Sequence, residues 1–190
     1  MNRRIFLAAS GTAVAAAAVG WAGLGRTAMR GALTDEQIEA MQQNWREFLP
    51  EGHERAFDLA RVEMTADQWR EQLGSDLAYN VLRKEATERA GTHPYNVEKR
   101  PGVFACAGCE LPLFTSEMKY DSGTGWPSYF AHIPGHLGTK KDFKLVWPRT
   151  EYHCIRCEGH QGHVFDDGPP PTGKRFCNNG VALTFVPRDS

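Results

Sequence analysis

Apolar residues recur at helical spacing between about residues 34 and 90 of the chain. Ile38, Met41, Trp45 and Phe48 follow one another at intervals of three or four residues, the period of a helix with one buried face. Polar residues with the spacing of helix caps precede such runs, most clearly Thr34, which has a glutamine three residues later. Helices are therefore predicted from Thr34 to about Phe48, from about His53 to Met64, after Thr65, and from Ser75 to the breakers Gly91 and Pro94.

After Pro101 the pattern changes to short apolar runs that are separated by Gly, Pro, Asp and Asn. Runs of this length between turn-forming residues are typical of antiparallel strands. The predicted strands fall at about residues 103–105, 111–114, 143–147, 152–155, 164–165 and 175–186. The second part of the chain is thus expected to be a β region with short strands.

The composition is that of a globular chain with ordinary charge. The 190 residues are 41% hydrophobic and carry 22 Lys and Arg against 23 Asp and Glu. A sizeable core is possible, and the composition excludes a disordered tail, a collagen-like chain and a multi-span membrane protein. Because there is no basic excess, a dedicated nucleic-acid binder is not expected, and no nucleic-acid partner is predicted.

The N-terminus has the pattern of an export signal. Arg3 and Arg4 precede an uncharged stretch, residues 5–24, that is rich in Ala and Gly. This arrangement resembles the twin-arginine (Tat) signal of bacterial proteins, so we expect residues 1–28 to direct the protein to the periplasm or out of the cell. The stretch is also close to the roughly 20 residues that span a bilayer. An uncleaved anchor therefore stays open, and it would be the only contact with a membrane.

Four of the five cysteines form two C-x-x-C pairs, namely Cys106, Cys109, Cys154 and Cys157. Paired knuckles of this kind typically hold one structural Zn²⁺ through four thiolates, and such a site is predicted here. Two alternatives stay open. The pairs could be disulfides in an exported protein, or the second pair could join His160 and His163 in a Cys2His2 site that leaves the first pair unused.

The fifth cysteine, Cys177, lies in a strand-like run with polar neighbours. With a period of two, Arg175, Cys177 and Asn179 are expected to share one face of a strand. A cation beside a thiol lowers the thiol pKa and favours the nucleophilic thiolate, and an amide can donate to a developing oxyanion. A single cysteine in an apolar strand is more often inert and buried, but these polar neighbours favour a reactive one.

Three sequence blocks resemble the signature motifs of the methionine-R-sulfoxide reductases (MsrB). They are GTGWPS at 123–128, GHVFDDGP at 162–169 and PTGKRFC at 171–177, and the C-x-x-C pairs occupy the zinc positions of that family. The resemblance covers about residues 65–187 in the family's order. It implies a mainly β fold of two antiparallel sheets, with helices on the N-terminal side and a structural zinc site. Residues 29–63 are then a helical extension, and 64–190 the catalytic domain.

The resemblance also implies roles for single residues. Cys177 corresponds to the nucleophile, whose thiolate attacks the sulfoxide sulfur, releases methionine and becomes a sulfenic acid. Trp126 corresponds to the aromatic residue that packs against the substrate's methyl group. The polar groups around the sulfoxide are His163, Asn179 and His160, and further substrate-side positions are Arg175, Asp167 and Phe165. The implied function is that of a peptide-methionine (R)-S-oxide reductase, an oxidoreductase that repairs oxidised methionine in proteins and peptides.

Regeneration of the nucleophile is expected to need a partner. Many members of the family have a resolving cysteine at the position of Thr124, where this chain has none. With four cysteines at the zinc site, an external thiol such as a thioredoxin-like protein must reduce the sulfenic acid. Two other classes of function stay open: a non-catalytic zinc-binding interaction module, and a related enzyme acting on a small thiol adduct. The first predicts loss of Cys177, His163 and Trp126, all of which are present, and the second would not need Trp126 together with the block at 175–177.

Overall fold

The computed structural model describes residues 33–52, 57–143 and 148–188. The predicted export signal lies outside these residues. Residues 32–190 form one compact unit, which is the part of the molecule described below. None of the helices in the described ranges has the length and apolar character needed to cross a bilayer.

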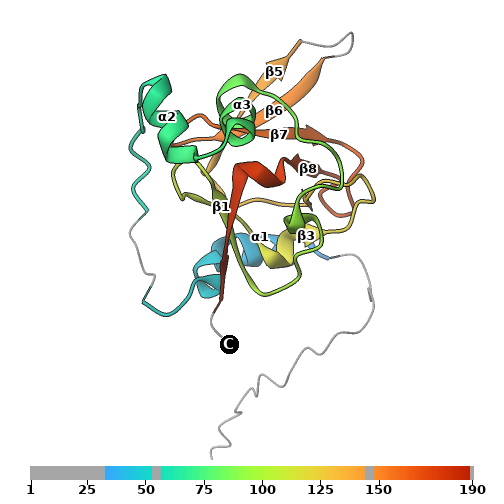
Figure 1. Ribbon diagram of the computed structural model, residues 1–190. Helices are drawn as coiled ribbons and strands as arrows, with labels where there is room; N and C mark the ends of the chain where they lie inside the picture. Colours follow the sequence, from blue (N-terminus) through green and yellow to red (C-terminus); the bar gives the residue numbers. More distant parts are fainter. Residues whose placement is uncertain (1–32, 53–56, 144–147, 189–190) are drawn as a thin grey trace, which may run out of the picture. The chain divides into compact units, whose positions relative to one another are not determined.

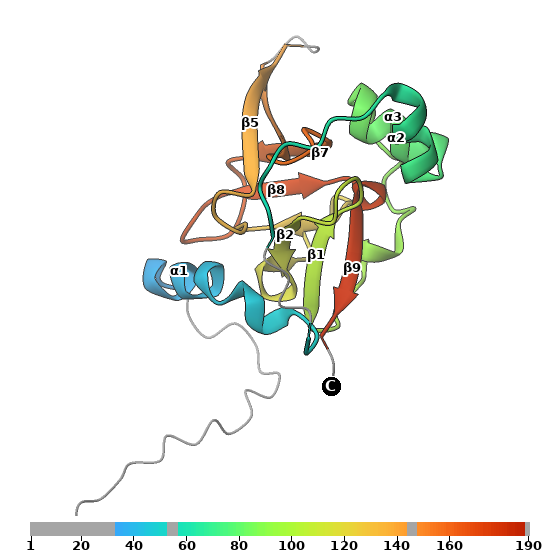
Figure 2. The same cartoon turned by 90° about the vertical axis from the view of Figure 1, so that its left-hand side faces the viewer.

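Short capped helices make up the N-terminal part of this unit. They are α1 (Asp35–Gln43), the 3₁₀ helix η1 (Trp45–Phe48), α2 (Ala66–Leu73) and α3 (Asp76–Lys84). The predicted capping boxes are confirmed, because the Thr34 and Thr65 hydroxyls each accept from a backbone N–H three residues later and the glutamine there accepts in return. Ser75 caps α3 in the same way through its hydroxyl. In both views, α2 and α3 lie at one end of the unit and α1 at the other (Figures 1 and 2).

Two parts of the helix prediction are wrong. Residues 57–64 form no helix, and 53–56 lie outside the described residues. The Val62 N–H donates to the Arg156 carbonyl instead of closing a helical turn, so this segment is bound to the turn between β6 (Arg149–Cys154) and β7 (His160–Phe165). The last helix ends at Lys84 rather than near Gly91, because Glu85 adopts a left-handed conformation with φ 56°.

The remaining chain forms two antiparallel sheets, as predicted. The three-stranded sheet has the order β2-β1-β9, and the six-stranded sheet has the order β3-β4-β8-β7-β6-β5. The strands are β1 (Gly102–Cys106), β2 (Pro112–Thr115), β3 (Lys119–Tyr120), β4 (Ser128–Tyr129), β5 (Leu137–Asp142), β6 (Arg149–Cys154), β7 (His160–Phe165), β8 (Arg175–Asn178) and β9 (Leu183–Pro187). The 3₁₀ helix η2 (Pro94–Asn96) precedes β1, η3 (Ser116–Met118) lies between β2 and β3, and η4 (Gly180–Ala182) lies between β8 and β9.

Two predicted strands differ from the structure. The apolar run at 143–147 is not a described strand: Phe143 follows β5 and is 73% exposed, and 144–147 lie outside the described residues. The strand there is β5, whose sequence LGTKKD is polar because it lies at the edge of the sheet. The run at 175–186 is divided by η4 into β8 and β9, which belong to different sheets.

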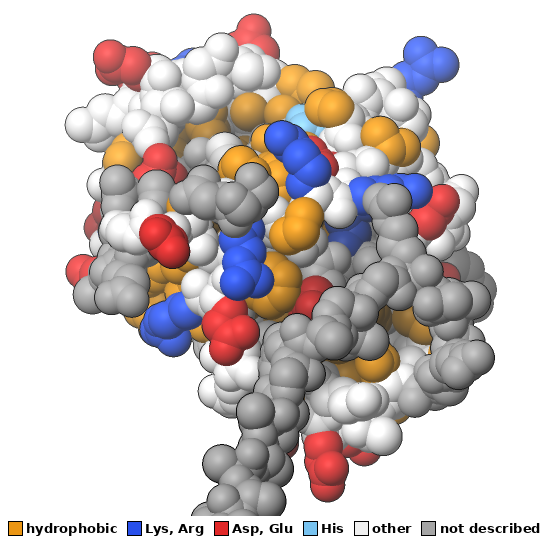
Figure 3. Space-filling view, turned by 90° about the horizontal axis from the view of Figure 1, so that it is seen from below, with side chains coloured by type: hydrophobic (Ala, Val, Ile, Leu, Met, Phe, Trp, Pro, Cys, Tyr) orange, Lys and Arg blue, Asp and Glu red, His pale blue; other side chains and the backbone are white. Residues whose placement is uncertain are grey.

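Aromatic side chains fill the core. Phe114 stacks on Tyr129 with ring centroids 3.9 Å apart, and Tyr152 and Phe176 meet edge to face. Trp45, from the predicted N-terminal extension, belongs to the same buried cluster. On the face seen in Figure 3, acidic and basic side chains lie interspersed, with apolar side chains between them.

Candidate active site

The register of the large sheet brings the thiol of Cys177 and the imidazole of His163 into one row. Cys177 on β8 lies opposite Ser128 on β4 and opposite His163 on β7. Directly opposed residues of antiparallel strands project from the same face of the sheet. The thiol and the imidazole, which lie in two different sequence blocks, are therefore neighbours on one surface.

Gly162 is needed for this close approach of β7 to β8. A Cβ atom at that position would lie 1.9 Å from the Cys177 carbonyl oxygen, which is a backbone atom that cannot move aside. Any other residue would push the two strands apart. The glycine before His163 in the sequence block is thus a structural condition for placing the histidine beside the cysteine.

A bulge in β7 brings a second histidine to the same face. Tyr152 pairs with Gly162 and His153 with His160, so Gln161 is an extra residue without a partner on β6. Without the bulge, residues 160 and 163 would point to opposite faces. With it, the rings of His160 and His163 lie edge to face at 5.4 Å between centroids.

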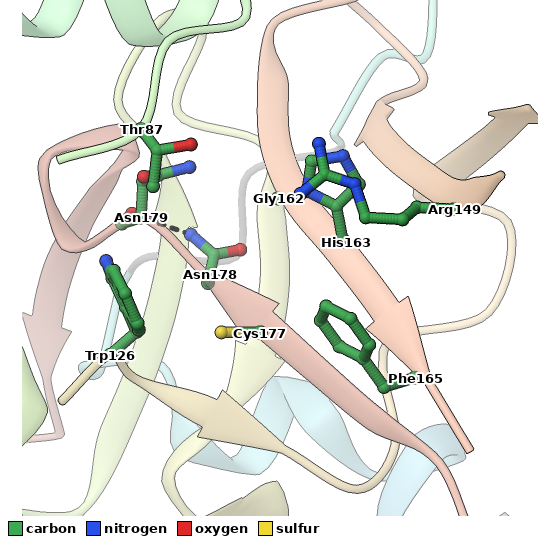
Figure 4. Close-up of a pocket in the computed structure, with 9 residues that line it drawn as sticks. All are labelled: Thr87, Trp126, Arg149, Gly162, His163, Phe165, Cys177, Asn178 and Asn179. Carbon is green, nitrogen blue, oxygen red and sulfur yellow. Dashed lines mark hydrogen bonds between the residues drawn. The ribbon is translucent and has the colours of Figure 1, made fainter. Parts of the chain in front are cut away.

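A cavity of about 140 Å³ opens over the cysteine. Figure 4 shows the Cys177 sulfur between Trp126 on one side and Phe165 and His163 on the other. The lining residues are Thr87, Trp126, Arg149, Gly162, His163, Phe165, Cys177, Asn178 and Asn179. The structure therefore brings five of the predicted site residues to one cavity. Arg175, Asp167 and His160 are not part of its lining.

His163 is held by a residue that the sequence did not indicate. Its Nε2 lies 2.8 Å from Oδ2 of Asp142, at the end of β5, and Arg149 Nη2 lies 2.7 Å from the same oxygen. Burial lowers the pKa of His163, and the bond to Asp142 raises it in part. His163 is therefore neutral near pH 7.

The surroundings of Cys177 correct one expectation. Arg175 and the Thr124 hydroxyl do lower the pKa of the thiol, but burial outweighs them and raises the pKa of Cys177 overall. Arg175 is instead engaged with Asp167 through two bonds, Nε to Oδ1 at 2.7 Å and Nη2 to Oδ2 at 2.8 Å, and its guanidinium lies over the Phe165 ring. The cysteine is at rest a thiol.

Asn179 reaches the cavity by a different route from the one expected. β8 ends at Asn178, so the strand alternation does not extend to Asn179, which begins the turn into η4. Its Nδ2 donates to the Gln161 carbonyl at 2.9 Å, and its Oδ1 accepts from the Glu88 N–H at 3.0 Å. The amide ties two segments together at the cavity wall.

Glu88 organises this wall and was missed in the sequence. Its carboxylate, 3% exposed, accepts the N–H of Gly180 at 2.6 Å and of Val181 at 2.9 Å. Its carbonyl accepts the indole N–H of Trp126 at 3.2 Å. No local pattern marks such a residue, because these hydrogen-bond partners lie 38 or more positions away.

His160 is buried beside His163 and does not line the cavity. Its Nδ1 is 2.9 Å from Oε1 of Glu151, and both side chains are 2% exposed. Lys140 on β5 lies 3.4 Å from the same carboxylate. Because His160 lies next to His163 and not at the cavity surface, it can act only through His163 in this structure.

The four knuckle cysteines meet in one buried cluster, and they are Cys106, Cys109, Cys154 and Cys157. All four sulfurs lie within 4.8 Å of one another, and two pairs are 3.6 and 3.5 Å apart. Each knuckle is closed by a glutamate with positive φ, Glu110 at 61° and Glu158 at 57°. All five cysteines are free, so neither pair is a disulfide. The two histidines of the Cys2His2 alternative are not in this cluster.

The spacing of the sulfurs suits a tetrahedral metal ion. Zn–S bonds of about 2.3 Å in a tetrahedron put the sulfurs about 3.8 Å apart. The observed separations are close to this value, and the cluster could bind a metal such as zinc without rearrangement. Gln161 also donates from Nε2 to the Cys106 sulfur at 3.3 Å, which links the cluster to the bulge below His163.

Comparison with known proteins places this arrangement in a family. The SelR domain matches residues 75–187. A "Peptide methionine sulfoxide reductase MsrB" of Pseudomonas putida (strain W619) is 46% identical over 132 residues, which are 69% of this chain and 98% of that protein. The protein of the same name from Agrobacterium fabrum is 46% identical over 128 residues, 67% of this chain and 94% of its own. "Peptide methionine sulfoxide reductase B1, chloroplastic" of rice is 48% identical over 121 residues, and the chain covers 56% of its length.

Proposed function

This chain belongs to the SelR family of peptide methionine sulfoxide reductases (MsrB), and we propose that it reduces methionine-R-sulfoxide in proteins with Cys177 as the nucleophile. The observation that carries the assignment of the nucleophile is the pairing of Cys177 with His163 across β7 and β8, in a cavity with an aromatic wall. Members of this family act on oxidised methionine in protein substrates and draw on a thiol reductant.

The reaction begins from a neutral thiol and a neutral imidazole. The Cys177 proton passes to His163 while the sulfur attacks the electrophilic sulfur of the sulfoxide. His163 then returns the proton to the sulfoxide oxygen. The attack forms a bond between the two sulfurs, and this bond breaks as the protonated oxygen moves from the substrate sulfur to Cys177. Cys177 becomes a sulfenic acid, and the loss of the S–O bond leaves methionine. The cysteine sulfur is oxidised by two electrons and the methionine sulfur is reduced by two.

Substrate binding uses the walls of the cavity. The Trp126 and Phe165 rings enclose the methyl group and the side chain of the substrate, and their placement selects one sulfoxide epimer. Asn179 donates from its amide toward the sulfoxide oxygen. Arg175 and Asp167 act from outside the cavity lining by fixing β8 and the Phe165 ring, and His160 acts by packing on His163.

Regeneration requires a second thiol from outside the chain. Four of the five cysteines form the metal cluster, and the fifth is the nucleophile. An external thiol, such as that of a thioredoxin-like protein, attacks the Cys177 sulfenic acid to give a mixed disulfide and water. A further thiol then releases reduced Cys177 and carries away the disulfide.

The metal cluster holds one structural Zn²⁺ in this proposal. The four sulfurs are the soft ligands that zinc prefers, and their spacing fits tetrahedral coordination. The ion would close both knuckles and add to folding stability. Four thiolate ligands would leave no open coordination position, so the ion would take no part in the reaction.

The decisive test is turnover of both epimers of a blocked methionine sulfoxide with a small dithiol as reductant. The R epimer should be reduced and the S epimer left, and Cys177→Ser should abolish turnover while thermal unfolding stays unchanged. Equal turnover of the two epimers would contradict the assignment. Absence of turnover with native folding and bound metal would favour the non-catalytic zinc-binding module.

We further propose that residues 1–28 are a twin-arginine export signal, followed by an extension at 29–63 and the catalytic domain at 64–190. The support is the Arg3-Arg4 pair before an uncharged stretch. The protein would then repair oxidised proteins in the bacterial periplasm or outside the cell. Fractionation of cells that express wild type and Arg3→Lys/Arg4→Lys tests this: the variant should stay in the cytoplasm. An exported protein of full-length mass in the membrane fraction would indicate an uncleaved anchor.

A further inference from the structure

We propose that Asp142, held by Arg149, is the positioning residue that fixes the tautomer of His163 and stabilises its protonated form. The proposal rests on the assignment of His163 as the group that carries the thiol proton. It goes beyond that assignment because it names the residue through which the sheet controls the imidazole.

The first part of the argument is geometric. Asp142 Oδ2 lies 2.8 Å from His163 Nε2, and the two side chains are 5% and 11% exposed. An ionised carboxylate can only accept a hydrogen bond, so the neutral imidazole must carry its hydrogen on Nε2. Nδ1 is then left with its lone pair, and that nitrogen is the one that can accept the Cys177 proton.

Arg149 gives the carboxylate a fixed position. Its Nη2 lies 2.7 Å from the same Oδ2, and it also lines the cavity. Asp142 is the last residue of β5 and Arg149 the first of β6, and the two are register partners. The pair therefore closes the described end of this hairpin and aims one carboxylate oxygen at the histidine on β7.

The second part concerns the charges around the imidazole. Burial lowers the pKa of His163, and so do Arg149 on β6 and His160 on β7. Asp142 on β5 is the group that raises it, by its hydrogen bond and by its charge. On β8 the facing group is Cys177, a thiol at rest. On β6 the residue opposite His163 is Glu151, whose carboxylate lies against His160 and Lys140. Without Asp142, the imidazole would lose its hydrogen-bonded carboxylate, so the proton taken from the thiol would be held less strongly.

The same sheet contains a second carboxylate–imidazole pair, which does not reach the cavity. His160 and Glu151 also form a carboxylate–imidazole contact, at 2.9 Å, with Lys140 beside it. That pair lies behind the cavity, and His160 is not among the lining residues. Only the Asp142 pair belongs to a histidine that reaches the cavity, among the residues that the structure describes.

The test uses two variants of the full chain that differ in one property. Asp142→Asn keeps an oxygen that can accept from Nε2 but removes the charge, whereas Asp142→Leu, of similar size, removes both. Nuclear magnetic resonance on protein with labelled histidine gives the titration midpoint of His163 and, from the nitrogen shifts, its tautomer. Neither measurement needs a sulfoxide, so the result is independent of the proposed reductase activity.

We expect the wild type to have the Nε2–H tautomer. In Asp142→Asn the tautomer should be retained, and the midpoint should fall by about one pKa unit, which is about 1.4 kcal/mol, because a charged acceptor holds the imidazolium more strongly than a neutral one. At a given pH above the midpoint, this is about a tenfold smaller imidazolium fraction. In Asp142→Leu the tautomer should become mixed as well.

Thermal unfolding shows whether each variant is folded, and the control variant is Asp76→Asn, at an exposed position on α3. If Asp142→Leu fails to fold, Asp142→Asn alone decides. An Nδ1–H tautomer in the wild type, or an unchanged midpoint in Asp142→Asn, would overturn the proposal. A shifted midpoint in a protein that reduces neither epimer would leave the positioning role standing and refute the reductase assignment instead.

Discussion

Replacing Glu88 with glutamine tests how the cavity wall is held. The carboxylate accepts two backbone N–H groups at the start of η4 and is buried at 3% exposure. Glutamine keeps one acceptor and turns an NH₂ group toward the other N–H. One charge-assisted hydrogen bond is lost, which costs about 2–3 kcal/mol when the partner stays buried. For a chain of this size, that lowers the melting temperature by roughly 4–12 °C.

The same change should lower activity at temperatures where both proteins are folded. Glu88 also binds Trp126 through its carbonyl and Asn179 through its N–H. A loosened wall misplaces both side chains, and a misplacement of about 1 Å can cost about 100-fold in rate. The assays are thermal unfolding and kcat/KM on the R epimer, with Glu71→Gln on the exposed face of α2 as the matched control. A Glu88→Gln protein that melts and turns over like this control would refute the reasoning.

Three other outcomes are expected. Cys154→Ser should release the metal, measured by elemental analysis, and lower the melting temperature by roughly 10 °C or more, because metal binding contributes to folding free energy; a metal-free protein of unchanged stability would contradict this. Trp126→Ala should raise KM for the R epimer more than it lowers kcat, because an apolar wall is lost, and an unchanged KM would remove Trp126 from the binding site. Thr124→Cys should form a disulfide with Cys177 after one turnover, seen by mass analysis, because Thr124 lies beside that sulfur; only sulfenic acid in this variant would show that the two positions cannot be joined.

Local patterns in the sequence predicted the features that depend on near neighbours. The capping residues Thr34, Thr65 and Ser75 start their helices because their partners lie three residues away. The C-x-x-C pairs form knuckles for the same reason. The period of two placed Arg175 and Cys177 on one strand, and the register with β7 then brought the histidine of the second block beside the thiol.

Features that depend on distant partners could not be predicted in this way. The helical pattern before Met64 is overridden by the bond from Val62 to Arg156, which lies 94 positions further along the chain. The bulge at Gln161, which places His160 on the same sheet face as His163, leaves no trace in the hydrophobic pattern. Asp142 appears in the sequence as one more charge at the end of a polar edge strand, and only the fold shows that it meets His163.

Burial acts in opposite directions on the two groups that meet across β7 and β8. It raises the pKa of Cys177 and lowers the pKa of His163, because in both cases it disfavours the charged form. The reactive state is therefore the neutral pair, with one proton that can move from sulfur to nitrogen and on to the sulfoxide oxygen.

As pH falls below the lowered pKa of His163, the imidazole is already protonated and cannot accept the thiol proton. As pH rises past the raised pKa of Cys177, the thiolate attacks but the proton for the leaving oxygen is gone. The pH profile of kcat/KM should accordingly be bell-shaped and wide, with its acid limb below 6.5 and its alkaline limb above 9.0, the ordinary pKa values of the two groups. A profile whose rate already falls between these values as pH rises would show that the resting site is an ion pair instead.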